Sequence, residues 1–127
     1  MRTGNILAVL AVIVVAGCST GLRKPPPCIS QPAEAVSVTV QRDRSVVGAP
    51  ATMFFVLGGE RIYGLLLGQR YSFRIDPGEY TIGYDLGFNA CRQRVFLDPH
   101  QSYLIDMAPG CNIDVLNLTN PCENRAL

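Results

Sequence analysis

From residue 36 onward, apolar and polar side chains alternate along the chain with a period of two. Residues 36–41 alternate valine with polar side chains, as in a β-strand with one buried face. Residues 53–57 are continuously apolar, which is typical of a central strand. The Gly-Gly pair at residues 58–59 predicts a tight turn, because glycine adopts positive φ without steric cost. Residues 61–67 are expected to return as the second strand of that hairpin.

Further alternating segments follow, separated by turns that contain proline. These segments are 71–75, 80–84, 92–97, 102–107 and 113–118. The turn at residues 76–79 reads Asp-Pro-Gly-Glu, in which proline presets φ and glycine accepts the left-handed position. A second turn, Asp-Pro-His-Gln, occupies residues 98–101. We expect each of these two turns to close a hairpin.

This succession of short strands predicts the fold class. Nothing between residues 33 and 127 has the period of a convincing helix. We therefore predict an all-β protein, an antiparallel β-sandwich of about 7–8 short strands. A small closed barrel is the second possibility.

The N-terminus has a different character from the rest of the chain. Arg2 precedes an apolar run over residues 6–16, which is too short for a membrane-spanning helix of about twenty residues. The run ends in Val15-Ala16-Gly17-Cys18, which resembles the bacterial lipobox. The resemblance implies that residues 1–17 are a cleaved lipoprotein signal peptide and that Cys18 carries acyl chains such as palmitate. An ordinary secretory peptide or an uncleaved anchor are the alternatives.

The residues after Cys18 extend this interpretation. By the same resemblance, Ser19 in place of aspartate implies sorting to the bacterial outer membrane, with the domain facing the periplasm. Residues 18–32 are then the lipidated cysteine and a proline-rich tether, and residues 33–127 are the β-sandwich domain. The three prolines at 25–27 predict a stiff polyproline spacer that holds the domain off the bilayer. A ligand for a proline-recognising partner is the alternative.

Four cysteines remain in the domain, namely Cys28, Cys91, Cys111 and Cys122. An even number in a small exported chain predicts two disulfides in an oxidising compartment. Their spacing does not supply the close pairs typical of a zinc site. Three pairings are possible. We favour Cys91–Cys111, which flank an expected hairpin, and Cys28–Cys122, near the two ends of the domain.

The charge of the chain argues against one class of partner. The chain has 11 Lys and Arg against 10 Asp and Glu. Nucleic-acid binding normally needs a basic patch and a pI above about 9, so no nucleic-acid partner is expected. No polybasic run is present to hold anionic lipid, and the predicted membrane attachment depends on Cys18.

Little in the sequence suggests catalysis. The single histidine, His100, lies in a turn with Asp98 and Ser102 nearby. A general base needs an orienting partner and a nucleophile within hydrogen-bond reach, and neighbours in an exposed turn normally serve the turn itself. The carboxylates lack metal-loop spacing, and the glycines lack the strand–turn–helix context of a phosphate loop. We predict no enzyme activity and no catalytic, cofactor or metal site.

Arginines and tyrosines are the candidates for a binding surface. Four arginines stand out, Arg70, Arg74, Arg92 and Arg94, and the last three have the outward phase of their strands. If these three converge on one face, they would form a modest basic patch for an acidic partner or glycan, but outward arginines more often keep a sheet face soluble, and that interpretation is favoured. The tyrosines have the inward phase and are expected in the core with their hydroxyl groups at its rim. They are Tyr63, Tyr71, Tyr80, Tyr84 and Tyr103.

Residues 56–68, 71–84 and 101–106 carry a family resemblance. Their Gly-Gly turn, Gly-Leu-x-x-Gly, Pro-Gly-Glu-Tyr and Gln-Ser-Tyr motifs resemble those of small bacterial lipoproteins of unknown function with an immunoglobulin-like or transthyretin-like β-sandwich. The chain is also similar to domains named for a Pro-Glu-Gly-Ala motif. The resemblance implies fold and compartment, and it transfers no catalytic residue.

Two functions follow as expectations. The first is a non-catalytic binding or accessory module of the cell envelope, anchored in the outer membrane and bound to an envelope protein. The alternative is a small disulfide-stapled inhibitor or ligand-binding lipoprotein, similar to lysozyme inhibitors. An inhibitor would present a polar loop to its target, and residues 85–90 and 98–101 are the candidates.

Overall fold

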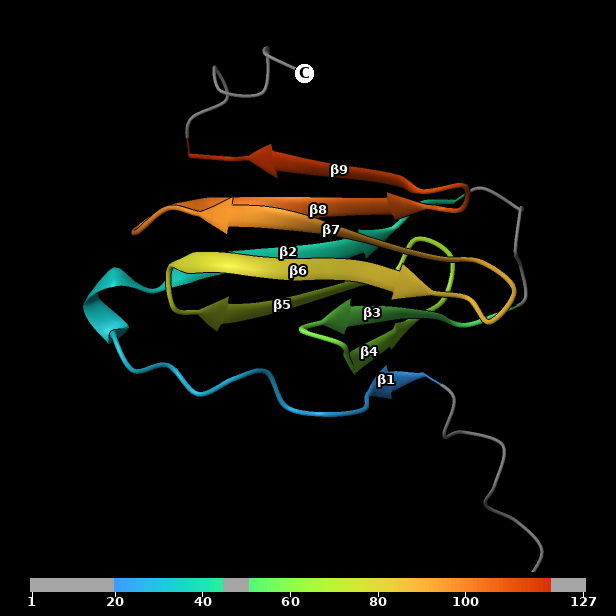
Figure 1. Ribbon diagram of the computed structural model, residues 1–127, viewed down its shortest axis with the longest axis horizontal. Helices are drawn as coiled ribbons and strands as arrows, with labels where there is room; N and C mark the ends of the chain where they lie inside the picture. The colour runs from blue at the N-terminus through green and yellow to red at the C-terminus, as the bar shows by residue number, and fades with distance from the viewer. Residues whose placement is uncertain (1–19, 45–50, 120–127) are drawn as a thin grey trace, which may run out of the picture.

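The computed structural model describes residues 20–44 and 51–119 as two β-sheets that face each other (Figure 1). The first sheet has the strand order β1-β4-β3-β6-β7, and the second has the order β5-β2-β8-β9. The elements are β1 (Gly21–Leu22), η1 (a 3-10 turn, Pro32–Glu34), β2 (Val36–Arg42), β3 (Met53–Leu57), β4 (Glu60–Leu65), β5 (Arg70–Ile75), β6 (Gly78–Asp85), β7 (Ala90–Leu97), β8 (Ser102–Ala108) and β9 (Asn112–Asn117). Among these residues, no helix is long and apolar enough to cross a membrane.

The predicted β-sandwich is confirmed, and the barrel is not formed. The described strands pair within their own sheets and none pairs across from one sheet to the other. They number nine, because residues expected to be tether add the two-residue strand β1. All described pairs are antiparallel except β2 and β8, which run parallel. Cys18 and Cys122 lie outside the described residues, so the lipidation of Cys18 and the Cys28–Cys122 pairing stay predictions.

The core lies between the sheets and is formed by the inward residues of the alternating segments. The apolar residues of β2 and β8 face those of β3 and β6. The fully buried members include Val38, Phe55, Ile82 and Ile105. Each such side chain contributes roughly 1.5–3 kcal/mol relative to exposure. As the continuous apolar run predicted, β3 is the middle strand of its sheet.

Both proline-containing turns were predicted to close hairpins, and this was wrong. Residues 76–77 connect β5 in the second sheet to β6 in the first, and residues 98–101 connect β7 in the first to β8 in the second. Proline has no N–H to donate to a ladder, which favours a change of partner at these points. The alternation correctly identifies the buried side of each strand, since both sheets direct that side into one core. The hairpins of the described chain are β3–β4, β6–β7 and β8–β9.

The predicted Cys91–Cys111 disulfide is present and joins the two sheets. Cys91 belongs to β7, Cys111 lies in the turn between β8 and β9, and their Cα atoms are 5.3 Å apart. The bond therefore does not close the hairpin that the sequence suggested. It links the first sheet to the second at one end of the sandwich.

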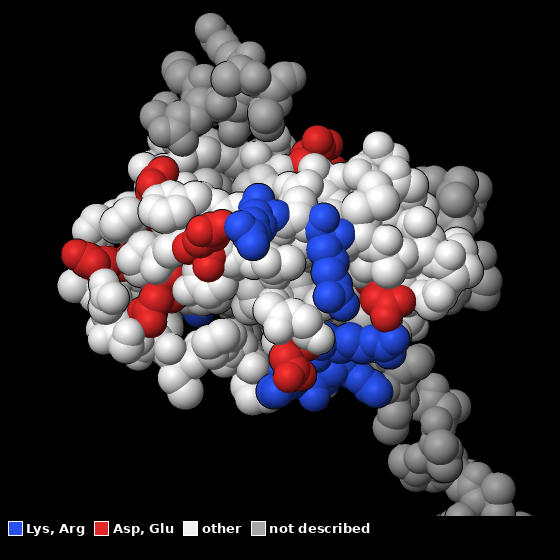
Figure 2. Space-filling view, viewed as in Figure 1, with Lys and Arg blue, Asp and Glu red and all other residues white. Residues whose placement is uncertain are grey.

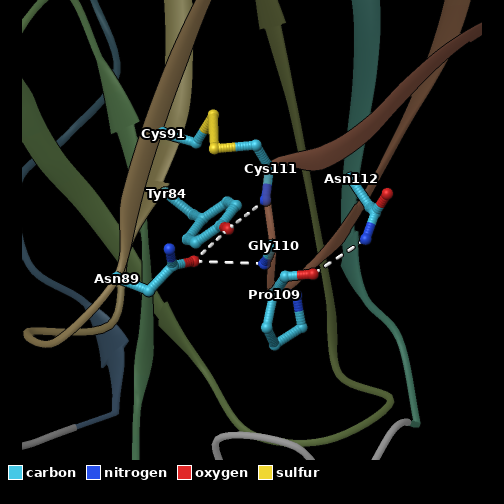
Figure 3. The surroundings of a disulfide bond; sticks show 7 residues. All are labelled: Tyr84, Asn89, Cys91, Pro109, Gly110, Cys111 and Asn112. Carbon is cyan, nitrogen blue, oxygen red and sulfur yellow. Dashed lines mark hydrogen bonds between the residues drawn. A yellow bond between two sulfur atoms is a disulfide. The ribbon is translucent and has the colours of Figure 1, made fainter.

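A hydrogen-bond network beside this disulfide joins the β6–β7 turn to the β8–β9 turn (Figure 3). The Tyr84 hydroxyl donates to the side-chain oxygen of Asn89 and accepts the Cys111 N–H at 2.8 Å. The Asn89 oxygen also accepts the Gly110 N–H at 3.2 Å. Tyr84 is almost fully buried, and these two hydrogen bonds satisfy its hydroxyl group at the edge of the core. The β6–β7 turn is consequently fixed against the β8–β9 turn.

Removing the disulfide should destabilise the domain without changing its fold. The cysteines are 20 residues apart, and a loop of that length corresponds to about 3 kcal/mol in the chain-entropy account. We expect a Cys91→Ala/Cys111→Ala variant to lose this amount of unfolding free energy in urea titrations. Reduction of the wild type should give a similar loss, and an unchanged midpoint in both experiments would contradict this role.

Candidate binding surface

The segment that precedes η1 is docked along one edge of the sandwich, contrary to the expectation of a free spacer. We call residues 20–31 the N-terminal strap. Its strand β1 pairs with β4, and the N–H groups of Arg23 and Lys24 donate to the Ile62 carbonyl oxygen at 2.8 and 3.2 Å. The polyproline residues therefore follow a docked strand and span part of the domain itself (Figure 1).

The far end of the strap is held by one carboxylate. Asp76 follows β5 and accepts the N–H groups of Ser30 and Gln31 at 3.0 Å and the Ser30 hydroxyl at 2.7 Å. The hydroxyl bond, followed by the two N–H bonds, holds the pKa of Asp76 below its ordinary value. The strap thus runs from the edge strand of the first sheet to the end of edge strand β5 in the second.

A cavity of about 380 Å³ lies between the strap and the sandwich. The strap contributes Lys24, Pro25 and Pro27, and the sandwich contributes Leu57, Gly58, Glu60, Ile62 and Tyr80. Apolar side chains form much of its wall, and a Lys24–Glu60 ion pair at 3.1 Å lies among its lining residues. Its volume is within the range of small-molecule sites. Cys28 is exposed on the strap and forms no disulfide with another described residue.

Basic side chains gather on the outer face of the first sheet. The ring of Phe54 is covered by the guanidinium groups of Arg61, 4.5 Å from its centroid, and of Arg23, 5.6 Å away. Arg61 also pairs with Asp85 at 2.6 Å. The Gly87 N–H, and then Arg61, hold the pKa of Asp85 below its ordinary value. This arrangement places two arginines over one half-buried ring.

We call this surface the arginine face. Its basic residues are Arg23, Lys24, Arg61, Arg92 and Arg94. Three carboxylates accompany these five cations, namely Glu60, Glu79 and Asp85. Figure 2 shows most of the blue side chains of this view gathered over the strands at the β1 edge, with separate ones over the middle of the face. The face is net basic although the whole chain is nearly neutral.

Of the three arginines considered for a common basic patch, only two lie on the same face. Arg92 and Arg94 lie together on β7. Arg74 belongs to β5 in the other sheet, where its guanidinium donates to the Pro32 carbonyl oxygen at 3.2 Å. Arg70 begins the same strand. The outward phase places a residue on an outer face, but it does not distinguish between the two outer faces of a sandwich.

The remaining sequence candidates lie where structural roles explain them. His100 is an exposed turn residue with φ of 62°, and its N–H donates to the Glu34 carbonyl oxygen. In the described part of the chain, no hydrogen bond joins the side chains of Asp98, His100 and Ser102. No group of three potential metal ligands occurs among residues 20–44 and 51–119.

The tyrosines lie in or beside the core, as predicted. Tyr84 and Tyr103 are buried, and the other three pack against the core from intermediate positions. Tyr63 and Tyr71 stack across the gap between the sheets with centroids 4.2 Å apart. Burial, with a smaller contribution from Tyr63, raises the pKa of Tyr71 above its ordinary value. These rings close the edge beneath the strap.

The outer face of the second sheet carries an acidic pair. Asp106 on β8 lies directly opposite Asp114 on β9. Burial, followed by the nearby charges of Asp43 and Asp114, raises the pKa of Asp106. The outer face of the second sheet thus carries carboxylates on β8–β9 and the arginines Arg70 and Arg74 on β5.

Replacing Asp76 should release the far end of the strap. In an Asp76→Asn variant, one carboxylate oxygen is lost and the remaining acceptor is uncharged, so the amides of Ser30 and Gln31 should exchange faster by NMR hydrogen exchange. Because the pKa of Asp76 is lowered, its hydrogen bonds to the strap are intact at any pH above the ordinary pKa of aspartate. They are lost only as the pH falls through the lowered pKa. An Asp98→Asn control should leave both amides protected. Unchanged hydrogen-exchange protection of the two amides in Asp76→Asn would contradict the role of Asp76 in holding the strap.

Neutralising Asp106 should stabilise the domain at neutral pH. A carboxylate with a raised folded pKa costs stability once it is ionised, so stability falls as pH rises from the ordinary aspartate range through the raised value. We expect Asp106→Asn to increase the unfolding free energy by about 0.2–1 kcal/mol at pH 7, the range of a cross-strand pair. In urea titrations the gain should shrink toward zero in acid. A gain that is independent of pH would contradict the electrostatic origin.

Comparison with known proteins assigns no family to the chain. No protein-family model matches the chain. No curated protein matches it either. Among solved structures, the N-terminal domain of AlgF from P. aeruginosa is similar, with 18% sequence identity and a TM-score of 0.47 over 64% of this chain and 92% of that one.

Proposed function

We propose that this protein is a non-catalytic binding module of the cell envelope, anchored by lipid on Cys18 in the outer membrane and facing the periplasm. Its partner is an acidic envelope protein, and the arginine face is the surface that binds it. The observation that carries this proposal is the excess of cations over carboxylates on one outer sheet face of a nearly neutral chain.

The geometry of the arginine face supports recognition of carboxylates. Arg61 is held between Phe54 and Asp85, so its position is set before any partner arrives. Arg92 lies in the same cross-strand row as Arg61, with β3 and β6 between them, and is exposed. Guanidinium groups bind carboxylates with two parallel hydrogen bonds, which gives both geometric specificity and affinity.

Two observations support the compartment. The N-terminal motif ending in Cys18 resembles a lipobox. The Cys91–Cys111 disulfide belongs to an oxidising environment such as the periplasm. Three acyl chains make attachment stable, since a single chain binds only marginally.

A photo-crosslinking amino acid would test the face directly. At Thr81, in the middle of the arginine face, it should capture a discrete envelope protein in cells, and capture should fall about tenfold with Arg92→Glu. Placed at Thr39, in the middle of the opposite outer face, it should capture nothing comparable. Arg74→Glu makes the same charge change on that opposite face and should leave the Thr81 product intact. Equal capture from both faces, or equal loss with both reversals, would contradict the proposal.

The cavity under the strap supports the alternative of a ligand-binding lipoprotein. Its volume suits a small amphiphilic molecule with an apolar body beside Leu57 and Ile62 and a polar group at the Lys24–Glu60 pair. The inhibitor variant has less support, because the tip of the β6–β7 loop is Phe88, an exposed apolar side chain rather than a polar plug. Stoichiometric loss of lysozyme activity on addition of the protein would favour the inhibitor. A Leu57→Trp change that fills the cavity and abolishes ligand binding would favour the ligand carrier.

A further inference from the structure

One end of the sandwich brings together the point where the chain enters the fold and several exposed apolar side chains. Cross-strand pairing places Gly21, Gly64, Phe54, Asp85 and Ala90 in a single row across the first sheet. Because β1 and β4 are antiparallel, residue 20 lies beyond this row on the same side as loops 66–69 and 86–89. Figure 1 shows the start of β1 and both loops at one end. We call it the loop end.

The loop end is apolar where it is most exposed. Phe88, at the tip of the β6–β7 loop, is 70% exposed, and Leu66 and Leu67 in the β4–β5 loop are 39% and 38% exposed. Leu22 on β1 is 55% exposed. Large apolar side chains grouped in this way commonly mark a contact surface.

Phe88 is presented by a rigid loop. The Asp85 carboxylate accepts the Gly87 N–H at 2.7 Å, and the Leu86 N–H donates to the Asn89 carbonyl oxygen at 2.8 Å. The Asn89 side chain is in turn held by Tyr84 and Gly110 beside the disulfide. The exposed ring therefore loses little conformational freedom on contact with another surface.

The distance from the proposed anchor identifies that surface. Gly21 is fixed to β4, and Cys18 lies three positions before it in the chain. An extended chain spans at most about 3.3–3.6 Å per residue, so a lipidated Cys18 lies within roughly 11 Å of the loop end. A lipid bilayer holding those acyl chains must then be adjacent to this end of the domain. The prolines at 25–27 cannot increase the separation, because they come after the docked strand.

We infer that the loop end is seated on the bilayer surface, with Phe88 inserted at the level of the lipid headgroups; this inference rests on the lipid anchor of the proposed function. Transfer of the exposed ring from water into lipid is favourable and requires no rearrangement of its loop. The strands of the first sheet then rise away from the membrane, and the arginine face stays open to the side.

Tryptophan fluorescence tests the seating, because the chain contains no tryptophan. The full lipidated chain, purified from membranes, is reconstituted in vesicles of phosphatidylethanolamine and phosphatidylglycerol with and without chain-brominated lipid. The matched variants are Phe88→Trp and Phe96→Trp. Phe96 is 65% exposed but lies six residues along β7 from Ala90, which is about 20 Å farther from the loop end.

Fluorescence from the F88W variant should shift to shorter wavelength and be strongly quenched by brominated lipid, whereas that of F96W should remain unchanged. If the protein floats with the vesicles and both variants respond equally, or neither responds, the seating is overturned while the anchor stands. If the protein does not float with vesicles, the anchor fails and the seating fails with it.

Discussion

The docking of the N-terminal strap along the open edge of the sandwich determines how the rest of the molecule is organised. At one end, β1 completes the ladder of β4, and at the other, Asp76 binds the backbone of Ser30 and Gln31. Between these attachments the strap closes a cavity against Leu57 and Ile62. An edge strand would otherwise expose unpaired backbone groups, and covering it removes that liability. The same docking positions Arg23 over Phe54.

A second constraint acts at the loop end. The disulfide joins β7 of the first sheet to the β8–β9 turn of the second, and the Tyr84 hydroxyl joins β6 to the same turn. These two links oppose sliding of one sheet relative to the other. Gly83, next to Tyr84, shows how closely β6 and β7 approach, because a Cβ at this position would lie 1.8 Å from the Cys91 carbonyl oxygen. A side chain of any size is therefore incompatible with the present spacing of these strands. Close packing and covalent linkage act on the same few residues.

The alternation of side chains predicted the strands and their buried sides, because burial in a sandwich depends on local period alone. Strand partners depend on long-range pairing, which explains why the turns at 76–77 and 98–101 were predicted as hairpins and not as crossings between sheets. The arginine face had a partial signal in Arg92 and Arg94. The stacking of Arg23 on Phe54 had none, since these two residues are distant in sequence, whereas Arg61 lies opposite Phe54's strand in the predicted hairpin. Arg42, the last residue of β2, has the same inward phase as the valines before it and is almost fully buried, with its guanidinium donating to the Leu65 carbonyl oxygen.

If the strap sets the domain on the membrane, anchoring and partner binding use different parts of one sandwich. Contact with lipid involves the ends of strands, where the loops carry Phe88, Leu66 and Leu67, whereas binding involves the flat outer face of the first sheet. Another envelope protein can reach a face that stands upright beside the bilayer by approaching along the membrane. The cations of the arginine face lie within a Debye length of anionic headgroups only near the loop end. Arg92 and Arg94 lie progressively farther along β7 from that end. Because Arg92 shares its cross-strand row with Arg61, Arg94 is the member of the arginine face that lies farthest from lipid.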